Sequence, residues 1–364
     1  MEGFYIAALQ RVPGLGVSGV MSLLEKFPSA EYAWNASSDE LAEVKSISSP
    51  LQSALISFRA EEAGLPEQMA EVCQKKQISV CTRDDAAYPA LLREINRPPL
   101  VLFYRGKLES EGACLAMVGS RRATAYGKGT AEFLAREIAG AGVTVISGAA
   151  LGIDTASHKG ALQTGKTVAV LGCGVDVAYP SSNRRLLDEI AENGAVVSEY
   201  APGTRPVAAF FPARNRIISG ISLGTVVVEA AERSGSLITA EMALSEGRDV
   251  FAVPGSIFSE QSRGTNRLIQ QGAKLVQCAQ DILSDYIERP QVDAAKKIPS
   301  DSKEELTAEE REIYNVLSFE QPQSVDDIIY RLNGSNVSNI SFLLLQMELK
   351  GIVTEDSDHN YLKH

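Results

Sequence analysis

Residues 115–172 read LAMVGSRRATAYGKGTAEFLAREIAGAGVTVISGAALGIDTASHKGALQTGKTVAVLG, a pattern that indicates the fold class. Short runs rich in Val and Ile, bounded by Gly, alternate with longer segments of helical period. Strands buried on both faces have this composition, because helices cover both sides of a parallel sheet. The sequence therefore predicts an α/β domain with a parallel sheet between two layers of helices.

The alternation continues to about residue 276, which sets this domain at residues 113–284. Residues 1–112 are predicted as an N-terminal helical domain plus a connector. The tight turn Pro13-Gly14-Leu15-Gly16 precedes apolar residues at helical spacing, which is typical of a helix-hairpin-helix. The turn either offers backbone N–H groups to a nucleic-acid phosphate or joins two packed helices, and the negative charge of the block favours packing.

Residues 285–303 are polar, contain two prolines and show no period, so they are predicted as a linker. Residues 304–364 contain three amphipathic segments and end in IVTEDSDHNYLKH, which predicts three helices and a hairpin, a winged-helix pattern. The third segment carries only Lys350 against Glu348, so it neutralises no phosphates. A protein-interaction or regulatory role is therefore favoured over duplex binding.

The charge of the chain is unevenly distributed. The 364 residues predict two or three domains, and the net charge of −11 counts weakly against nucleic-acid binding. Divided by domain, however, the net charge is −4 for residues 1–112, +1 for 113–284 and −8 for 304–364. The α/β domain is therefore the one domain whose net charge would not repel an anionic ligand from a basic groove.

The five cysteines are widely spaced, contain no C-x-x-C pair and accompany only three histidines. This pattern argues against a disulfide framework and against a zinc site. The N-terminus lacks the basic and apolar regions of a signal peptide, and no run of about 18 apolar residues is present. We therefore expect a cytoplasmic protein without a membrane partner.

Two catalytic patterns occur in an unsuitable context. Residues 160–167, GALQTGKT, match a phosphate loop, but a helix is predicted before them and a strand after them, the reverse of what the loop requires. Residues 220–224, GISLG, match a nucleophile elbow with the same inverted order. Cys173 is interpreted as a small buried thiol, and His158 has no identifiable partner. No dinucleotide fingerprint follows a strand, so no cofactor is expected.

Arginine instead recurs in the loops of the α/β domain. Arg121 and Arg122 follow Gly119-Ser120 directly after a strand, where ligands of such sheets bind. Guanidinium groups, a hydroxyl and backbone N–H groups there favour a phosphate ligand. Further arginines open two helices of the same domain, at Arg184-Arg185 and at Arg214-Asn215-Arg216.

The motifs of this domain resemble those of the DNA-processing protein A family (DprA, also called Smf), most closely between residues 88 and 276. They include VGSRRATAYGK, SGAALGIDTASHKGAL, AVLGCGVDVAYPSSNRRL, FPARNRIISGIS and ERSGSLITAEMALSEGRDVFAVPG, in the order in which the family has them. Such a series of long motifs is highly specific.

The resemblance implies an extended Rossmann-like domain, a sterile-alpha-motif-like helical domain and a winged-helix unit. It also implies a non-enzymatic, cytoplasmic protein that binds single-stranded DNA as a dimer, protects incoming strands during natural transformation and helps load the recombinase RecA. Single-strand binding protein is the further partner implied. Exposed phosphates and unstacked bases suit a basic groove of this kind.

Matched by position, Arg121 corresponds to the family's principal DNA-contacting arginine. The family often has a lysine after its Tyr-Pro pair, where this chain has Ser181. Either Arg184 or Arg185 reaches the same phosphate, or the contact is weaker. Phe211 either offers a stacking face to a base or packs in the core, and core packing is the commoner outcome for an aromatic residue. The expected DNA-binding residues are Gly119, Ser120, Arg121, Arg122, Ser181, Arg184, Arg185, Phe211, Arg214, Asn215 and Arg216, with no catalytic, cofactor or metal residue.

An enzyme on the same fold is the main alternative. Rossmann-like phosphoribohydrolases use an arginine and a glutamate beside a Gly-rich helix start, and Arg214 with Glu229 or Glu241 would be the candidates here. Fold analogy alone supports this nucleotide or nucleoside-phosphate hydrolase. A transcription factor acting through the winged helix is disfavoured by the acidity of that unit.

Overall fold

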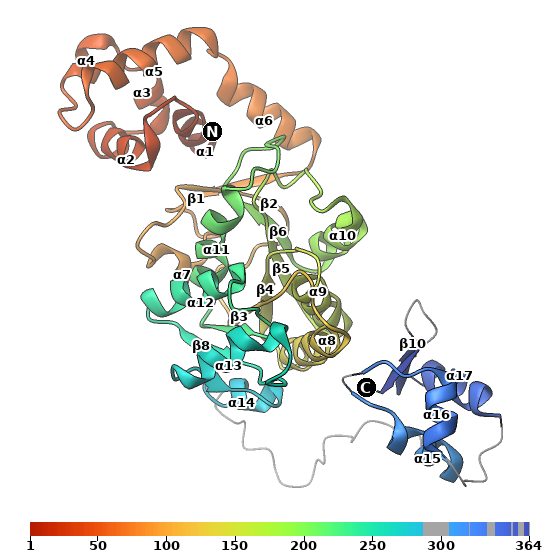
Figure 1. Cartoon of the computed structure of the whole chain (residues 1–364). Helices are drawn as coiled ribbons and strands as arrows, with labels where there is room; N and C mark the ends of the chain where they lie inside the picture. The colour runs from red at the N-terminus through yellow and green to blue at the C-terminus, as the bar shows by residue number, and fades with distance from the viewer. Residues whose placement is uncertain (287–305, 320, 333–338, 351, 356–359, 364) are drawn as a thin grey trace, which may run out of the picture. The chain divides into compact units, whose positions relative to one another are not determined.

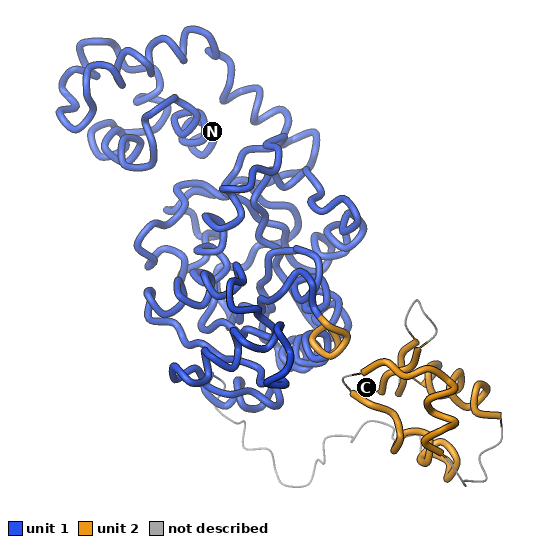
Figure 2. The backbone as a smooth tube through the Cα atoms, viewed as in Figure 1, with its two compact units in different colours: residues 1–123, 130–286 blue, residues 124–129, 287–364 orange. Residues whose placement is uncertain are grey.

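The computed structural model describes residues 1–286, 306–319, 321–332, 339–350, 352–355 and 360–363. Its contacts divide the chain into two compact units (Figure 2). One comprises residues 1–123 and 130–286, and the other residues 124–129 and 287–364. Each unit is described by itself below.

A nine-stranded sheet forms the centre of the first unit (Figure 1). Its order is β1-β2-β6-β5-β4-β3-β7-β8-β9, and β3 to β9 are mutually parallel where they pair. The strands are β1 (Ser79–Thr82), β2 (Val101–Gly106), β3 (Cys114–Val118), β4 (Thr144–Ser147), β5 (Thr167–Val170), β6 (Ala195–Ser198), β7 (Gly224–Val227), β8 (Asp249–Ala252) and β9 (Lys274–Leu275).

The burial of the strands explains their sequences. Every residue of β5, β6 and β7 is buried, because helices cover both faces of the sheet. Helices α9 (Ile153–Thr164) and α10 (Arg184–Asn193) pack on one face, and α11 (Phe210–Ile221) and α12 (Gly235–Ser245) on the other (Figure 1). The predicted doubly covered parallel sheet is confirmed.

Strands β1 and β2 were not anticipated. They come from the connector assigned to the N-terminal domain, and they extend the sheet at one edge by antiparallel pairing of β2 with both β1 and β6. The segment between them contains only the short helix α7 (Ala90–Arg93). The α/β domain therefore begins about 35 residues earlier than the repeating β-α pattern indicates.

The strand order reverses at β3. Strand β4 lies on one side of β3 and β7 on the other, so the chain after β3 continues to β4 and the chain after β7 continues to β8, on the opposite side. In open α/β sheets such a reversal opens a crevice where ligands bind. The other helices of this domain are α8 (Ala125–Gly140), α13 (Arg263–Gln270) and α14 (Ala279–Leu283), with 3-10 turns η1 (Ser181–Asn183) and η2 (Glu260–Ser262).

Six helices form the N-terminal part of the first unit. Gly14 and Gly16 both adopt positive φ in the turn that was predicted between the first two helices, a conformation that glycine tolerates. Trp34 is 2% exposed, and its carbonyl oxygen accepts a hydrogen bond from Arg59 at 2.6 Å. The helices are α1 (Glu2–Gln10), α2 (Gly16–Lys26), α3 (Ala30–Asn35), α4 (Ser38–Ala42), α5 (Ser49–Glu61) and α6 (Leu65–Lys75).

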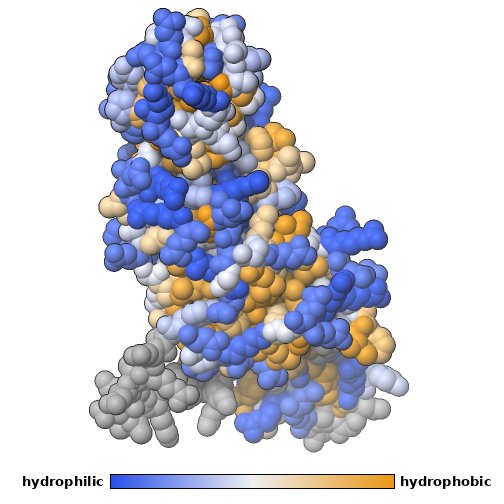
Figure 3. Space-filling view, turned by 90° about the vertical axis from the view of Figure 1, so that its left-hand side faces the viewer, coloured by the Kyte–Doolittle hydropathy of each residue, from blue (hydrophilic) through white to orange (hydrophobic). Residues whose placement is uncertain are grey.

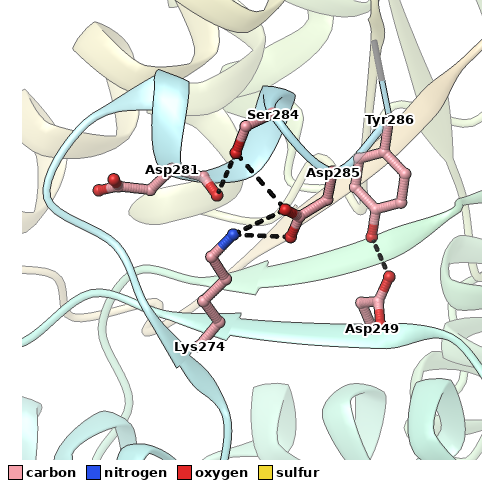
Figure 4. Close-up of polar contacts among 6 residues, drawn as sticks. All are labelled: Asp249, Lys274, Asp281, Ser284, Asp285 and Tyr286. Atoms are coloured by element: carbon pink, nitrogen blue, oxygen red, sulfur yellow. Dashed lines mark hydrogen bonds and ion pairs between the residues drawn. The ribbon is translucent and has the colours of Figure 1, made fainter. Parts of the chain in front are cut away.

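Asp285 and Tyr286, which the sequence placed in the linker, lie against the sheet (Figure 4). The hydroxyl of Tyr286 donates to Asp249 at the start of β8, at 2.5 Å, and Lys274 donates to both carboxylate oxygens of Asp285. Tyr286 also packs edge-on against Phe251, with ring centroids 6.1 Å apart. The chain is thus fixed at the amino ends of β7 and β8, opposite the crevice. The rest of the predicted linker lies outside the described residues.

The second unit contains a winged helix with its own core. Helices α15 (Ala308–Val316), α16 (Val325–Arg331) and α17 (Ile340–Leu349) pack around Ile313, Ile328, Leu344 and Met347. Strands β10 (Val353–Glu355) and β11 (Tyr361–Lys363) pair antiparallel, as the terminal hairpin predicted. The starts of α15 and α16 were predictable from the sequence because Thr307 and Ser324 form capping boxes.

His158 of α9 is a core residue of the α/β domain. The hydroxyl of Thr167 donates to the carbonyl of Val145, so it accepts from Nδ1 of His158, 2.7 Å away. The ring is fully buried and its Nε2 has no hydrogen-bond partner. Burial, and to a smaller extent the charge of Arg214, lower the pKa of His158 to about 3. The histidine is therefore neutral in the folded protein.

Folding stability is expected to fall as the pH drops below about 6.5. The unfolded chain protonates His158 near its ordinary pKa, whereas the folded chain does not until about pH 3. Protons therefore favour the unfolded state in this window, at up to about 1.4 kcal/mol per pH unit. Urea unfolding of the wild type and of His158→Gln between pH 7.5 and 5.5 checks this. An equal pH slope in both proteins would contradict the assignment.

Candidate nucleic-acid interface

A crevice of about 710 Å³ opens at the carboxyl end of the sheet, where the strand order reverses. The loop after β3, the start of α11 and the start of α12 line it. Its charged residues are Arg121, Arg122, Arg214 and Asp154. Of the predicted DNA-binding residues, the structure brings together Gly119, Ser120, Arg121, Arg122, Phe211, Arg214 and Asn215 in this crevice.

Close packing of glycines fixes the loop that carries Arg121. A Cβ on Gly119 would lie 2.5 Å from Ile153 and 2.8 Å from the carbonyl oxygen of Glu229. Gly152 has φ +81°, and its Cβ would lie 2.3 Å from the carbonyl of Ser120. The backbone N–H of Ser120 donates to Glu229 at 2.8 Å, which ties the loops after β3 and β7 together. The exposed side chains of Arg121 and Arg122 therefore project from a rigid support.

An aromatic wall stands beside Arg121. Its guanidinium lies over the ring of Phe211, 5.6 Å from the centroid, and Phe211 contacts Tyr179 with centroids 5.1 Å apart. Tyr179 is 42% exposed. Phe210 instead stacks on Tyr200 at 4.2 Å. The two adjacent phenylalanines thus separate, and Phe211 faces the crevice.

Arg214 lies beneath the crevice rather than at its mouth. Its side chain is 3% exposed. Nη1 donates to the carbonyl oxygens of Gly148, at 3.0 Å, and Val170, and Nε donates to Asn215 at 3.2 Å. Burial lowers the pKa of Arg214 to about 10, and the guanidinium remains charged at neutral pH. Its contacts link the carboxyl ends of β4 and β5 to α11.

Asp154 provides the opposite charge in this buried layer. A Cβ on Gly148 would lie 2.6 Å from Arg214 Nη2 and 2.7 Å from Asp154 Oδ2, so glycine is required between them. Asp154 accepts from the backbone N–H of Ala150 at 3.2 Å. Burial raises the pKa of Asp154, and Arg214 and this hydrogen bond oppose the rise. Asp154 is 7% exposed. It therefore serves as the buried counter-charge of Arg214.

Arg216 is turned away from the crevice. It pairs with Glu199 at 2.5 Å, and the side chains are 22% and 13% exposed. Its Nη1 is buried without a hydrogen-bond partner. Burial raises the pKa of Glu199, and Arg216 opposes that rise. Asn215 lines the crevice and accepts from Arg214.

Ser181, Arg184 and Arg185 do not line the crevice. All three are exposed, at η1 and at the first turn of α10. They follow Tyr179, which does line it, by two to six residues in the chain. Neither arginine has a salt bridge among the pairs found in the described residues.

Two parts of the crevice were not among the predicted DNA-binding residues, although the loop at Ser234–Ser236 follows a strand where ligands of such sheets bind. Tyr179 was noted within a motif but not as a site residue, although an aromatic side chain in a loop after a strand was a usable signal. Ser234, Gly235 and Ser236 at the start of α12 also line the crevice, and Ser234 accepts from the N–H of Ser236. They share the crevice with Arg121 because β3 and β7 are neighbours in the sheet. The sequence alone does not reveal this strand order.

The structure offers no nucleophile where the motifs suggested one. Burial raises the pKa of Cys173 to about 11, and its thiol donates to Val177. Ser222 is buried and donates to Ile218. The phosphate-loop match joins the end of α9 to β5, the inverted order that was predicted. Over the described ranges, no three Asp, Glu, His or Cys side chains gather as metal ligands.

None of the helices in the described part of the chain has the length and apolar character needed to cross a bilayer.

Comparison with known proteins identifies the family. Residues 79–287 match the model of DNA recombination-mediator protein A, and residues 297–359 match the DprA winged helix domain. Protein Smf of Synechocystis is 33% identical over 99% of this chain and 98% of its own length. DNA processing protein DprA of Streptococcus pneumoniae is 49% identical over 56% of this chain and 72% of its own length.

Two solved structures share the fold. The X-ray structure of DprA from Streptococcus pneumoniae has a TM-score of 0.69 and 38% identity, and the match covers 79% of this chain and 99% of that one. DprA from Helicobacter pylori, described with a unique single-stranded DNA binding mode, has a TM-score of 0.53 and 31% identity over 58% of this chain and 98% of its own. The chain therefore belongs to the DprA/Smf family of DNA recombination-mediator proteins.

Proposed function

We propose that this protein binds single-stranded DNA at the crevice of its α/β domain. The observation that carries the proposal is the exposed Arg121 packed against the Phe211–Tyr179 wall at the reversal of strand order. A guanidinium beside aromatic faces can hold a phosphate while a neighbouring base stacks, which is how proteins bind unpaired strands. The Helicobacter pylori relative described with single-stranded DNA supports the same ligand.

Phosphate contacts belong to the exposed arginines in this proposal. Arg121 and Arg122 project from the loop after β3, with Ser120 and Gly119 shaping its backbone. Arg184 and Arg185, next to Ser181, continue the cationic surface and replace the lysine that other members often have. Phe211 supplies the stacking face. Arg214, Asn215 and Arg216 shape the floor and the start of α11 from buried or paired positions.

The hydrolase alternative lacks its glutamate in the crevice, where the only lining carboxylate among the described residues is Asp154, beside Arg214. Glu241 is exposed on α12 and is absent from the lining, and the side chain of Glu229 is 1% exposed. Glu229 presents its backbone oxygen to Ser120 instead. The protein is therefore proposed to act without catalysis. Incubation with nucleoside monophosphates, followed by chromatography for free base, separates the two functions.

Anisotropy of a labelled mixed-sequence single strand is expected to report salt-steep binding by the full chain. Each phosphate neutralised contributes about −0.7 to the slope of log affinity against log salt, so three or four arginines predict a slope of about −2 to −3. An unrelated strand of equal length should bind within about threefold, because base stacking tolerates sequence. Absence of binding at low salt would refute the proposed function.

The wider role proposed is that of a recombination mediator. The protein would protect incoming single strands in natural transformation and help load RecA in the cytoplasm, working around single-strand binding protein. Membership of a family described as recombination mediators supports this role. RecA filament assembly on strands coated with single-strand binding protein tests it, and no acceleration over RecA alone would contradict it.

A homodimer through the α/β domain is also proposed. Phe258 and Ile257, between β8 and α13, are 89% and 78% exposed, and Leu275 on the edge strand β9 is 41% exposed. Hydrophobic surface gathers over this domain on the face shown in Figure 3. Apolar side chains this exposed are typical of a surface that a second copy covers.

Phe258→Ser is expected to shift the protein from dimer to monomer. Light scattering should give twice the 39.1 kDa of the chain for the wild type and one chain for the variant at the same concentration. The affinity lost reflects one buried aromatic anchor, about 2 kcal/mol or more. Phe133→Ser on α8, which removes a ring that is 46% exposed, is the matched control. A dimer unchanged by Phe258→Ser would place the interface elsewhere.

A further inference from the structure

The winged-helix unit exposes large apolar side chains on two packed helices. On α17, Phe342 is 58% and Leu345 is 50% exposed, and their spacing of three residues puts them on one side of the helix. On α16, Tyr330 is 79% and Ile329 is 49% exposed. None of the four belongs to the core of the unit. Helices α16 and α17 contact each other, and we call these four side chains, with Asp326, the α16–α17 surface.

This surface is unsuited to a DNA duplex. The third helix of a winged helix normally enters the major groove, where lysine and arginine neutralise phosphates. Helix α17 contains neither residue. Lys350, which follows it, donates to the buried Glu310 at 2.9 Å. The helix in the position for DNA recognition thus presents Phe342 and Leu345 instead of cations.

The charge around these apolar residues selects the partner. Residues 304–364 carry a net charge of −8. Asp326 and Asp327 are exposed in the first turn of α16, and Asp326 lies one helical turn from Ile329 and Tyr330. A second copy would bring like charges together at this surface, which is unfavourable. A segment with apolar residues on one side and lysine or arginine on the other is complementary to it.

We propose that the α16–α17 surface docks a cationic amphipathic helix of a partner protein. The partner's apolar side packs on Phe342 and Leu345, with Tyr330 and Ile329 at the neighbouring helix. Its lysine or arginine side chains lie near Asp326. This interaction is independent of the crevice in the α/β domain, so the winged-helix unit recruits a protein while the other domain holds the strand.

The test uses designed peptides with the full-length protein. The probe is a fluorescein-labelled peptide of about 18 Leu and Lys residues in which the Leu residues share one helical face, long enough to fold on binding. The comparison peptide has the same composition in an order that scatters the Leu residues. Fluorescence anisotropy at physiological salt gives the affinity, and the amphipathic peptide is expected to bind at least about tenfold more tightly than the scattered one.

Variants locate the binding surface. Phe342→Ser with Leu345→Ser keeps the charge of the unit and should weaken amphipathic-peptide binding at least about tenfold, because apolar anchors dominate such interfaces. Asp326→Asn should weaken it about two- to fivefold and flatten its salt dependence, since this is one exposed charge pair. Val17→Ser, an exposed apolar residue on α2 of the other acidic block, is the matched control and should change nothing.

Three results would overturn the proposal. The first is equal binding of the scattered peptide, which would show attraction by charge alone. The second is full binding by the Phe342→Ser, Leu345→Ser variant, with its thermal unfolding unchanged to show that the unit is folded. The third is tight binding of a short DNA duplex that the same double variant abolishes, which would make the surface a DNA site. None of these readouts depends on single-strand binding by the crevice.

Discussion

Arg121→Ala is expected to lower the affinity for unrelated single strands by roughly ten- to a hundredfold. The substitution removes a phosphate contact and also the cation that lies 5.6 Å over Phe211. Loss of such contacts costs about 1–3 kcal/mol each when bases stack nearby, and about 1.4 kcal/mol corresponds to a factor of ten. The salt slope should fall by about 0.7 to 1. Anisotropy titrations at several salt concentrations measure both quantities.

Arg136 supplies a closely matched control for this substitution. It also lies over a phenylalanine ring, that of Phe133, at 5.6 Å, but on α8 and outside the crevice. Arg136→Ala therefore removes the same kind of side chain and the same kind of contact. Affinity and salt slope should stay at wild-type values. Equal losses in both variants would show a general effect of net charge rather than a site at Arg121.

A substitution of Phe211 distinguishes base stacking from phosphate binding, the two roles assigned to the crevice. Phe211→Leu keeps the charge of Arg121, so the salt slope should persist while affinity falls through lost stacking. Arg121→Ala and Phe211→Leu thus divide the free energy of binding into a salt-dependent part from phosphate contacts and a salt-independent part from base contacts.

The parts of the fold with a strong local signal were predictable. Strands β5, β6 and β7 are buried along their whole length, which the continuous apolar runs indicated. Strands β1 and β2 were missed because two short antiparallel strands at a sheet edge, joined by an irregular segment, have no repeating period to detect. The winged helix was predictable because its helices carry capping residues and its hairpin ends the chain.

The candidate site shows what spacing cannot reveal. Arg121 and Arg214 look alike in sequence, since each opens or precedes a helix beside small residues. Their surroundings differ because Gly148 leaves room for both the Arg214 guanidinium and Asp154. These two residues are 60 positions apart in the chain, and the folding of the sheet brings them together. Tyr179 was overlooked for a related reason, as its contact with Phe211 joins the loop after β5 to the start of α11.

Arg214→Ala is expected to destabilise the α/β domain by about 3–5 kcal/mol, the usual cost of leaving a buried charge without its partner. The charge left behind is Asp154, which is 7% exposed and whose pKa burial already raises. The carbonyl oxygens of Gly148 and Val170 would also lose their donor. Urea unfolding at pH 7 measures the change in the free energy of unfolding.

Adding Asp154→Asn to Arg214→Ala distinguishes a structural arginine from a DNA contact. If Arg214 serves to balance Asp154, the double variant should regain part of the lost stability, because the neutral amide is less costly to bury than an unpaired carboxylate. Arg214→Lys should recover little, since a lysine ammonium cannot reproduce the guanidinium fork that reaches Gly148, Val170 and Asn215. Unchanged stability in Arg214→Ala, together with reduced strand binding, would instead make Arg214 a direct phosphate ligand. In that case the guanidinium would have to leave its buried site when DNA binds.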